Sequence, residues 1–126
     1  MYQGYAQDAY RTVEAKTASY YCKVEDNGKI LTNRGASGAV TITLPVNSTI
    51  PSGWWIMVYA VAAQNLIVAC SPADTMAALN DATADSVALQ TASEIIGGGF
   101  TFVWDGTGWL TFHHTEETQT VTVVTA

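Results

Sequence analysis

Alternating apolar and polar residues mark the clearest strands along this chain of 126 residues. Between Ala39 and Leu44, branched apolar residues alternate with threonines, a period of two that is typical of a strand with one buried face. The same alternation recurs between Phe100 and Trp104. A turn over 105–108 then leads into a returning strand over 109–114. We therefore predict three strands with one face toward a core.

The longest apolar run, Trp54 to Ala63, is apolar on both faces of a strand. A strand of this kind has to be covered on both sides. In a small β-domain the second sheet provides one cover, and a loop, the N-terminal arm or another subunit provides the other. We assign the second face to a subunit interface, and its residues are Trp55, Met57, Tyr59 and Val61. Residues 66–70 follow a Gln64-Asn65 turn and are also apolar on both faces.

Turn-forming residues separate these runs. Asn27-Gly28 is the strongest hairpin signal in the sequence, and it is predicted to join a strand over 18–25 to one over 29–32. Three glycines at 97–99 favour a bulge or a close approach of two backbones. Residues 71–84 are rich in turn formers, and we expect at most one helical turn there.

Together with strands over 85–90 and 118–125, these elements predict an all-β fold. About eight or nine short strands at this spacing are typical of a jelly-roll-like, antiparallel β-sandwich. The sandwich domain is expected to span residues 18–126. Residues 1–17 lack a clean apolar stripe, and we expect them to form an extended N-terminal arm.

The N-terminal arm carries spaced tyrosines, and tyrosine is enriched at protein interfaces. We therefore predict that the arm binds a neighbouring molecule. Ordinary packing onto its own domain is the alternative. The residues assigned to binding are Tyr2, Tyr5, Tyr10, Arg11 and Lys16.

Charge is scarce and unevenly placed. Charged residues make up 13% of the chain, about half the usual fraction, which suits a protein packed in an assembly and also suits a secreted β-domain. All five basic residues lie between Arg11 and Arg34, whereas the chain from Gly35 onward holds seven acids and no Lys or Arg. An acidic body repels phosphate, so nucleic acid is not an expected partner. The basic segment is a candidate docking surface for an acidic partner, or a merely solvated stretch.

Few residues are candidates for catalysis or ligand binding. His113 and His114 are strand neighbours that point to opposite faces, which disfavours a shared metal ion. A paired-acid site needs two carboxylates across a cleft, but the available ones sit among turn residues, where they bond to the backbone. These carboxylates are Asp74, Asp81, Asp85, Glu94 and Asp105. The four tryptophans are expected in the core rather than on a sugar-stacking platform, with Trp104 or Trp109 partly exposed. We expect no enzyme activity, no metal and no cofactor.

Cys22 and Cys70 are expected to be buried, reduced thiols, because two cysteines do not make a disulfide framework. No signal peptide is evident. No run approaches the roughly 18 apolar residues of a membrane helix. We therefore expect a soluble protein that is made in a cytoplasm and has no membrane partner.

The order of turns and strands resembles a module of tailed-bacteriophage virion proteins. The elements that carry the resemblance are Asn27-Gly28 with Ile30-Leu31-Thr32-Asn33, Gly35-Ala36-Ser37-Gly38, Val40-Thr41-Ile42-Thr43-Leu44-Pro45, Gly53 before an apolar strand, and Asp105-Gly106-Thr107-Gly108-Trp109. The resemblance covers residues 20–112 and consists of turns and strands rather than catalytic residues. It implies a jelly-roll or related β-sandwich, often trimeric, of the kind found in capsid decoration proteins, head fibres and tail fibres.

Two functions follow from this resemblance. The first is a capsid decoration, or cement, protein that binds the major capsid protein as a homotrimer and stabilises the shell by mass action. Such a protein would be made in the host cytoplasm and would work on the capsid surface of the virion. The second is a receptor- or glycan-binding module of a tail or head fibre, with glycan binding that depends on Trp109. Because the resemblance covers nearly the whole chain, which begins with Met and lacks a long fibrous segment, decoration is favoured.

Overall fold

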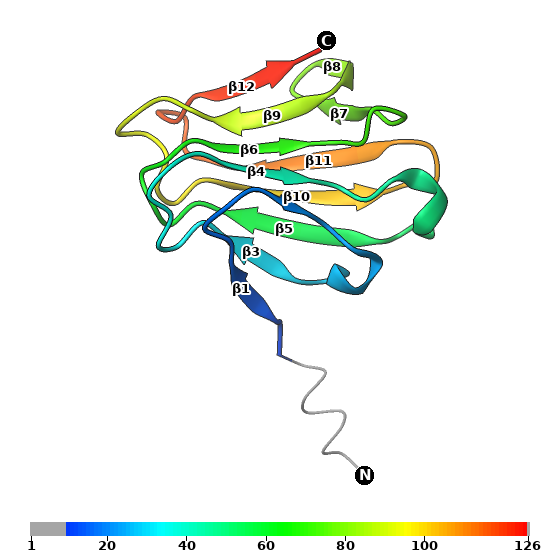
Figure 1. Ribbon diagram of the computed structural model, residues 1–126. Helices are drawn as coiled ribbons and strands as arrows, with labels where there is room; N and C mark the ends of the chain where they lie inside the picture. Colours follow the sequence, from blue (N-terminus) through cyan, green and yellow to red (C-terminus); the bar gives the residue numbers. More distant parts are fainter. Residues whose placement is uncertain (1–9, 126) are drawn as a thin grey trace.

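The computed structural model describes residues 10–125, and these residues form a β-sandwich of two mixed sheets (Figure 1). The large sheet contains, from edge to edge, β1 (Val13–Ala15), β3 (Ile30–Thr32), β5 (Trp55–Tyr59), β10 (Gly99–Trp104), β11 (Trp109–His114), β7 (Met76–Ala78) and β8 (Asp81–Ala84). The small sheet contains β12 (Val121–Val124), β9 (Ser86–Leu89), β6 (Leu66–Ala69), β4 (Val40–Thr43) and β2 (Tyr20–Tyr21). Two short 3₁₀ helices, η1 (Val24–Asp26) and η2 (Asn47–Thr49), lie in loops.

The predicted all-β sandwich is confirmed, with more and shorter strands than expected. The described residues form twelve strands rather than eight or nine. The sheets are mixed rather than antiparallel throughout, because β1, β3 and β5 run parallel in the large sheet and β2, β4 and β6 run parallel in the small one. β1 lies within the predicted N-terminal arm, where it pairs with β3 at the sheet edge.

The first six strands alternate between the two sheets, so that each loop carries the chain across the sandwich (Figure 1). Strands that are consecutive in the sequence therefore do not pair here. This arrangement contradicts the predicted hairpin at Asn27-Gly28. β2 pairs with β4 in the small sheet, whereas β3 pairs with β1 and β5 in the large sheet. Likewise, β5 and β6 lie in different sheets on either side of the Gln64-Asn65 turn.

The turn type explains why Asn27-Gly28 makes no hairpin. Asn27 has φ −51° and ψ 130°, and Gly28 has φ 79°. The amide of Lys29 donates to the carbonyl of Asp26 at 3.1 Å. These values describe a type II turn, whereas a two-residue hairpin needs type I′ or II′, which match the twist of paired strands. The turn instead forms the corner between η1 and β3.

A hairpin that the sequence did not predict joins β7 to β8. Leu79 and Asn80 both have positive φ angles, 42° and 70°, as a type I′ turn requires. Leucine is an unusual residue in this conformation, and the two strands contain mostly alanine, a poor strand former. The local sequence therefore resembled an irregular loop with a helical turn, and that prediction was wrong.

The core lies between the sheets and is filled by alternate residues of the predicted strands. Trp109, Phe100 and Phe102 are the largest of the fully buried side chains. The Trp109 ring packs edge-on against Trp54 and Trp104, with centroids 5.8 and 5.3 Å apart. The prediction that Trp104 or Trp109 is partly exposed is wrong, because only 4% and 0% of their surfaces are accessible. The turn at 105–108 leaves both rings directed inward.

The glycines at 97–99 permit the predicted close approach of two backbones. Gly97 donates to Ala60 O at 2.9 Å, and Ala60 donates to Gly98 O at 2.8 Å. Gly99 lies opposite Tyr59 in the β10–β5 pair. A Cβ atom at position 99 would lie 2.5 Å from Val58 O. Only glycine fits at this position without moving the backbone of β5.

Gly99→Ala is therefore expected to destabilise the protein by about 1–3 kcal/mol, as overpacking in a rigid site does. The measurement is urea unfolding of the purified protein. Gly38→Ala is the matched control, because a Cβ there meets nothing within 4 Å. Equal unfolding free energies for the two variants would contradict this prediction. They would show that the backbones of β5 and β10 can shift apart at position 99 without loss of stability.

Candidate interaction surface

The outward side chains of the large sheet form a broad apolar surface. Register places them in two rows of directly paired neighbours. The first row runs through Val13, Ile30, Met57, Thr101 and Phe112. The second runs through Trp55, Val103, Leu110 and Ala77. We call these nine residues the outer apolar face.

Exposure confirms which way these side chains point. Ile56 and Val58 have no accessible surface and fill the core, whereas Trp55, Met57 and Tyr59 between them are half-buried. On the outer apolar face, Val13, Phe112 and Leu110 keep 59%, 50% and 38% of their surfaces accessible. The strand that was predicted to be apolar on both faces thus has one face in the core and one on this surface.

Arg11 lies over the edge of the outer apolar face. Its guanidinium carbon is 4.8 Å from the centroid of the Trp55 ring, a cation–π contact. Tyr10, the first described residue, is 81% exposed. The chain's own N-terminal segment thus provides part of the cover that the sequence predicted for Trp55.

The predicted interface residues fall into three groups. Trp55 and Met57 belong to the outer apolar face, and Tyr59 and Val61 continue it as half-buried neighbours along the chain. Tyr10 and Arg11 lie beside it, whereas Tyr2 and Tyr5 lie outside the described residues. The remaining predicted residue, Lys16, belongs to a different cluster. A role in binding stays a prediction for all of them.

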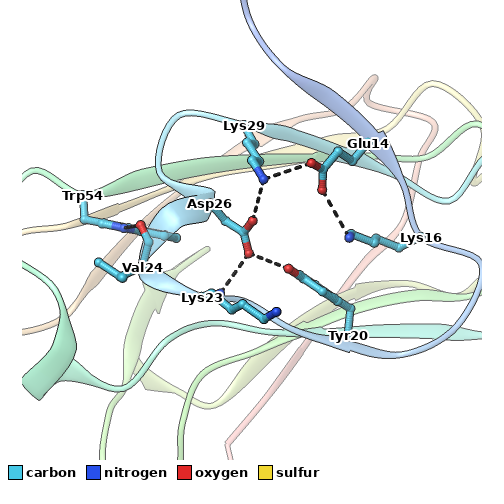
Figure 2. A network of polar contacts seen from close by, with 8 residues as sticks. All are labelled: Glu14, Lys16, Tyr20, Lys23, Val24, Asp26, Lys29 and Trp54. Atoms are coloured by element: carbon cyan, nitrogen blue, oxygen red, sulfur yellow. Dashed lines mark hydrogen bonds and ion pairs between the residues drawn. The ribbon is translucent and has the colours of Figure 1, made fainter.

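Lys16 is part of a polar network at the edge where β1 and β3 of the large sheet approach β2 of the small sheet (Figure 2). Its Nζ is 3.2 Å from Glu14 Oε1 and 3.7 Å from the centroid of the Tyr20 ring. Lys29 joins Glu14 to Asp26, with Nζ 2.9 Å from each carboxylate. The charges of Lys16 and Lys29 are therefore paired within the chain, which reduces what the basic segment offers to an acidic partner.

Asp26 is the centre of this network and is 2% exposed. Its Oδ2 accepts hydrogen bonds from the Tyr20 hydroxyl and the Lys23 amide, both at 2.8 Å. Trp54 Nε1 donates to Val24 O at 2.9 Å and ties η1 to the aromatic core (Figure 2). The network thus joins edge strands of both sheets to the loop between them.

Electrostatics in the network follow from burial and pairing. Burial alone would raise the pKa of Asp26, but the bonds from the Lys23 amide, Lys29 and Tyr20 outweigh it and hold the pKa below its usual value. Burial and the bond to Asp26 raise the pKa of Tyr20 to about 12. Hydrogen bonds from Lys29 and Lys16 lower the pKa of Glu14. All three groups therefore stay in their usual ionisation states near neutral pH, as a structural network requires.

The carboxylates considered for catalysis accept hydrogen bonds within their own turn or from a neighbouring loop. Asp105 Oδ1 accepts from the amides of Thr107 and Gly108 at 2.8 Å, which lowers the Asp105 pKa. Asp74 accepts from Asn47, and Glu94 accepts from Thr120. Histidines 113 and 114 are exposed, and the described residues contain no group of three or more His, Cys, Asp or Glu side chains arranged to hold a metal ion. These contacts support the predicted role of the carboxylates in turns.

Both cysteines are buried and free, as predicted. Burial and the nearby Asp26 raise the pKa of Cys22 to about 12, and burial with the nearby Asp85 raises that of Cys70 to about 11. The Cys70 thiol lies 3.3 Å from the carbonyl oxygens of Asp74 and Asp85, and its one S–H can donate to either. Neither thiol is poised to act as a nucleophile.

Alkylation of the native protein at pH 8 is expected to be at least about 100-fold slower than alkylation of the unfolded chain, because the thiolate is scarce and covered. Mass spectrometry with and without denaturant measures the two rates. Rapid labelling of either cysteine in native buffer, or a Cys22–Cys70 disulfide in non-reducing analysis, would contradict this prediction.

No family model matches the chain, and no curated protein matches it either. In the described part of the chain, no helix has the length and apolar character needed to cross a membrane.

Of the nine residues of the outer apolar face, only Trp55 and Met57 were predicted from the sequence as interface residues. Leu110 and Phe112 carried a usable signal, because they share one face of a strand whose other face holds Trp109. Val13 carried no such signal, because β1 is only three residues long and pairs with β3 in parallel. The surface becomes visible only when the strands are assembled.

Proposed function

We propose that this protein is a structural component of a tailed-bacteriophage virion, a capsid decoration protein that binds the major capsid protein as a homotrimer on the head surface. Such a protein is made in the host cytoplasm and stabilises the shell because it binds only assembled coat subunits. The observation that carries the proposal is the outer apolar face, which is a surface for packing rather than for chemistry. The pattern of turns between residues 20 and 112 supports the virion class.

Co-sedimentation with expanded capsids tests this proposal. The full chain is expected to load onto capsids in hundreds of copies per particle, whereas a fibre module would be present in only a few. A chain lacking residues 2–9 is expected to remain folded, because the deletion ends before β1 and before the Glu14 ion pairs, and to lose loading if the predicted arm contacts hold. Failure of the full chain to bind capsids would refute decoration.

The structure removes the main argument for the glycan-binding alternative. It required a tryptophan platform around Trp109, but that ring is fully buried against Trp54 and Trp104. A glycan array is therefore expected to show no binding that depends on Trp109. Strong, selective binding to one glycan would restore the fibre module as the better explanation.

A further inference from the structure

We propose that the outer apolar face is the surface on which a second copy of this chain packs. This inference rests on the homo-oligomer within the proposed function, but it holds whether or not the partner is a capsid. It extends two of the predicted interface residues, Trp55 and Met57, to a surface that crosses six strands, from β1 to β7.

The size of the face suits a small protein–protein interface. Each of the nine residues covers about 4.8 Å across the sheet and about 6.8 Å along its strand, which gives a footprint of roughly 300 Å². Tyr10, Arg11 and Tyr59 extend it at the rim. With that rim it reaches roughly 400 Å², which is less than the about 600 Å² per partner at the lower end of standard interfaces and is the size of a weak or transient contact. An apolar patch of this extent is comparable to the largest patch on a typical monomer, and such patches are often functional.

The charge distribution favours a copy of the same chain as the occupant. Neither row contains Lys, Arg, Asp or Glu, although the chain has 16 such residues and a net charge of −6. The charged groups beside it, Arg11, Glu25 and Lys29, lie around Trp55 at one end of the second row. Two acidic copies can meet here without bringing carboxylates together, and a strongly charged partner would find no complementary group. Every copy carries the uncharged, apolar counterpart that this face requires.

The small sheet provides a useful contrast. Its outer face also lacks charge, but it presents hydroxyls and small side chains such as Thr41, Thr43, Ser86 and Thr122. These groups can remain hydrated at little cost. Its exposed large side chains are Tyr21 and Val124 on the two edge strands, at 76% and 46%. The apolar surface that gains most from leaving water is therefore on the large sheet.

The relief of the outer apolar face provides complementary parts. Phe112 and Leu110 on β11 stand out as a ridge, whereas Met57, Thr101 and Val103 on β5 and β10 are half-buried and form a lower strip beside it. The ridge of one copy can rest on the strip of the next, as side chains interdigitate between packed sheets. Such a contact can repeat around a closed ring or pair two copies directly.

Light scattering after gel filtration at micromolar concentration tests this inference with the full chain. Wild type is expected at a multiple of 13.4 kDa. Phe112→Asp and Ala77→Glu place a carboxylate on the face at exposed positions, and each should weaken association at least about 10-fold by burying an unpaired charge. Tyr21→Asp is the matched control and should leave the mass unchanged. Thermal unfolding by circular dichroism shows that each variant is folded, and Ala77→Glu, which removes no core atom, keeps the test valid if Phe112→Asp unfolds.

A wild-type monomer, or an oligomer that survives both face substitutions, would overturn the inference. Capsid binding separates this result from the proposed function. A wild-type oligomer that dissociates in the face variants but never binds capsids supports the inference and refutes decoration. A wild-type monomer that loads onto capsids refutes the inference and supports binding to the capsid.

Discussion

Asp26→Ala is expected to lower the free energy of unfolding by about 3–5 kcal/mol, the usual cost of removing one partner from a buried charge network. The substitution strips Lys29, Tyr20 and the Lys23 amide of their shared acceptor. It also unlinks η1 from the edges of both sheets. Chemical denaturation at pH 7 measures the loss, and Glu25→Ala is the control, because Glu25 is exposed in the same 3₁₀ helix.

The stability difference between wild type and Asp26→Ala is also expected to depend on pH. The pKa of Asp26 is lower in the folded protein than the usual value near 3.9. Its ionised form therefore stabilises the fold above that unfolded-state value, and the contribution is lost as the pH falls through the lower, folded pKa. The difference between wild type and Asp26→Ala should shrink in acid below about pH 4. A difference that stays constant down to pH 2 would show that packing, not charge, carries the effect.

Asn33→Ala is expected to lower the free energy of unfolding by roughly 2–6 kcal/mol, because it leaves two backbone amides without an acceptor. Asn33 has no accessible surface. Its Oδ1 accepts from Val61 N at 2.7 Å and Ala62 N at 2.8 Å, and its Nδ2 donates to Ala62 O at 3.2 Å. The side chain thus holds the segment that carries the chain from β5 to β6.

Arg34→Ala is the matched control for Asn33, since Arg34 is its exposed neighbour in the same loop. Urea unfolding provides the comparison, and hydrogen exchange at Val61 and Ala62 shows where the structure opens. Faster exchange confined to this crossing is the expected signature. Unchanged exchange at both amides would mean that water replaces the Asn33 side chain without cost.

Strands with a regular period were predictable because burial of one face imposes that period directly. Residues 39–44 and 100–104 correspond closely to β4 and β10, and alternate residues of each fill the core. The close approach at 97–99 was also predictable, because glycine has few other reasons to occur three times in succession. In each case the property belongs to a few adjacent residues.

The remaining features depend on contacts between distant residues. Asn33 looked like an ordinary turn former, yet it is buried because the segment between β5 and β6 passes beside it. Asn27-Gly28 formed a turn as expected, but the pairing of its flanking strands is decided elsewhere, by β4 and β5. Most of the outer apolar face was missed for the same reason: its rows join side chains from β1, β3, β5, β10, β11 and β7. Local propensity says little about which strands become neighbours.

The alternation of the first six strands between the sheets has a consequence for synthesis and folding. None of these strands can pair with the strand made just before or after it. Val13 can pair only after Ile30 has been made, and Tyr20 only after Ile42. The first antiparallel neighbour of β5 is β10, which leaves the ribosome much later. The chain must therefore close long loops, which costs conformational entropy, before stabilising contacts form. Topologies of this kind fold slowly for their size. The N-terminal half should remain protease-sensitive on the ribosome until β10 and β11 have emerged.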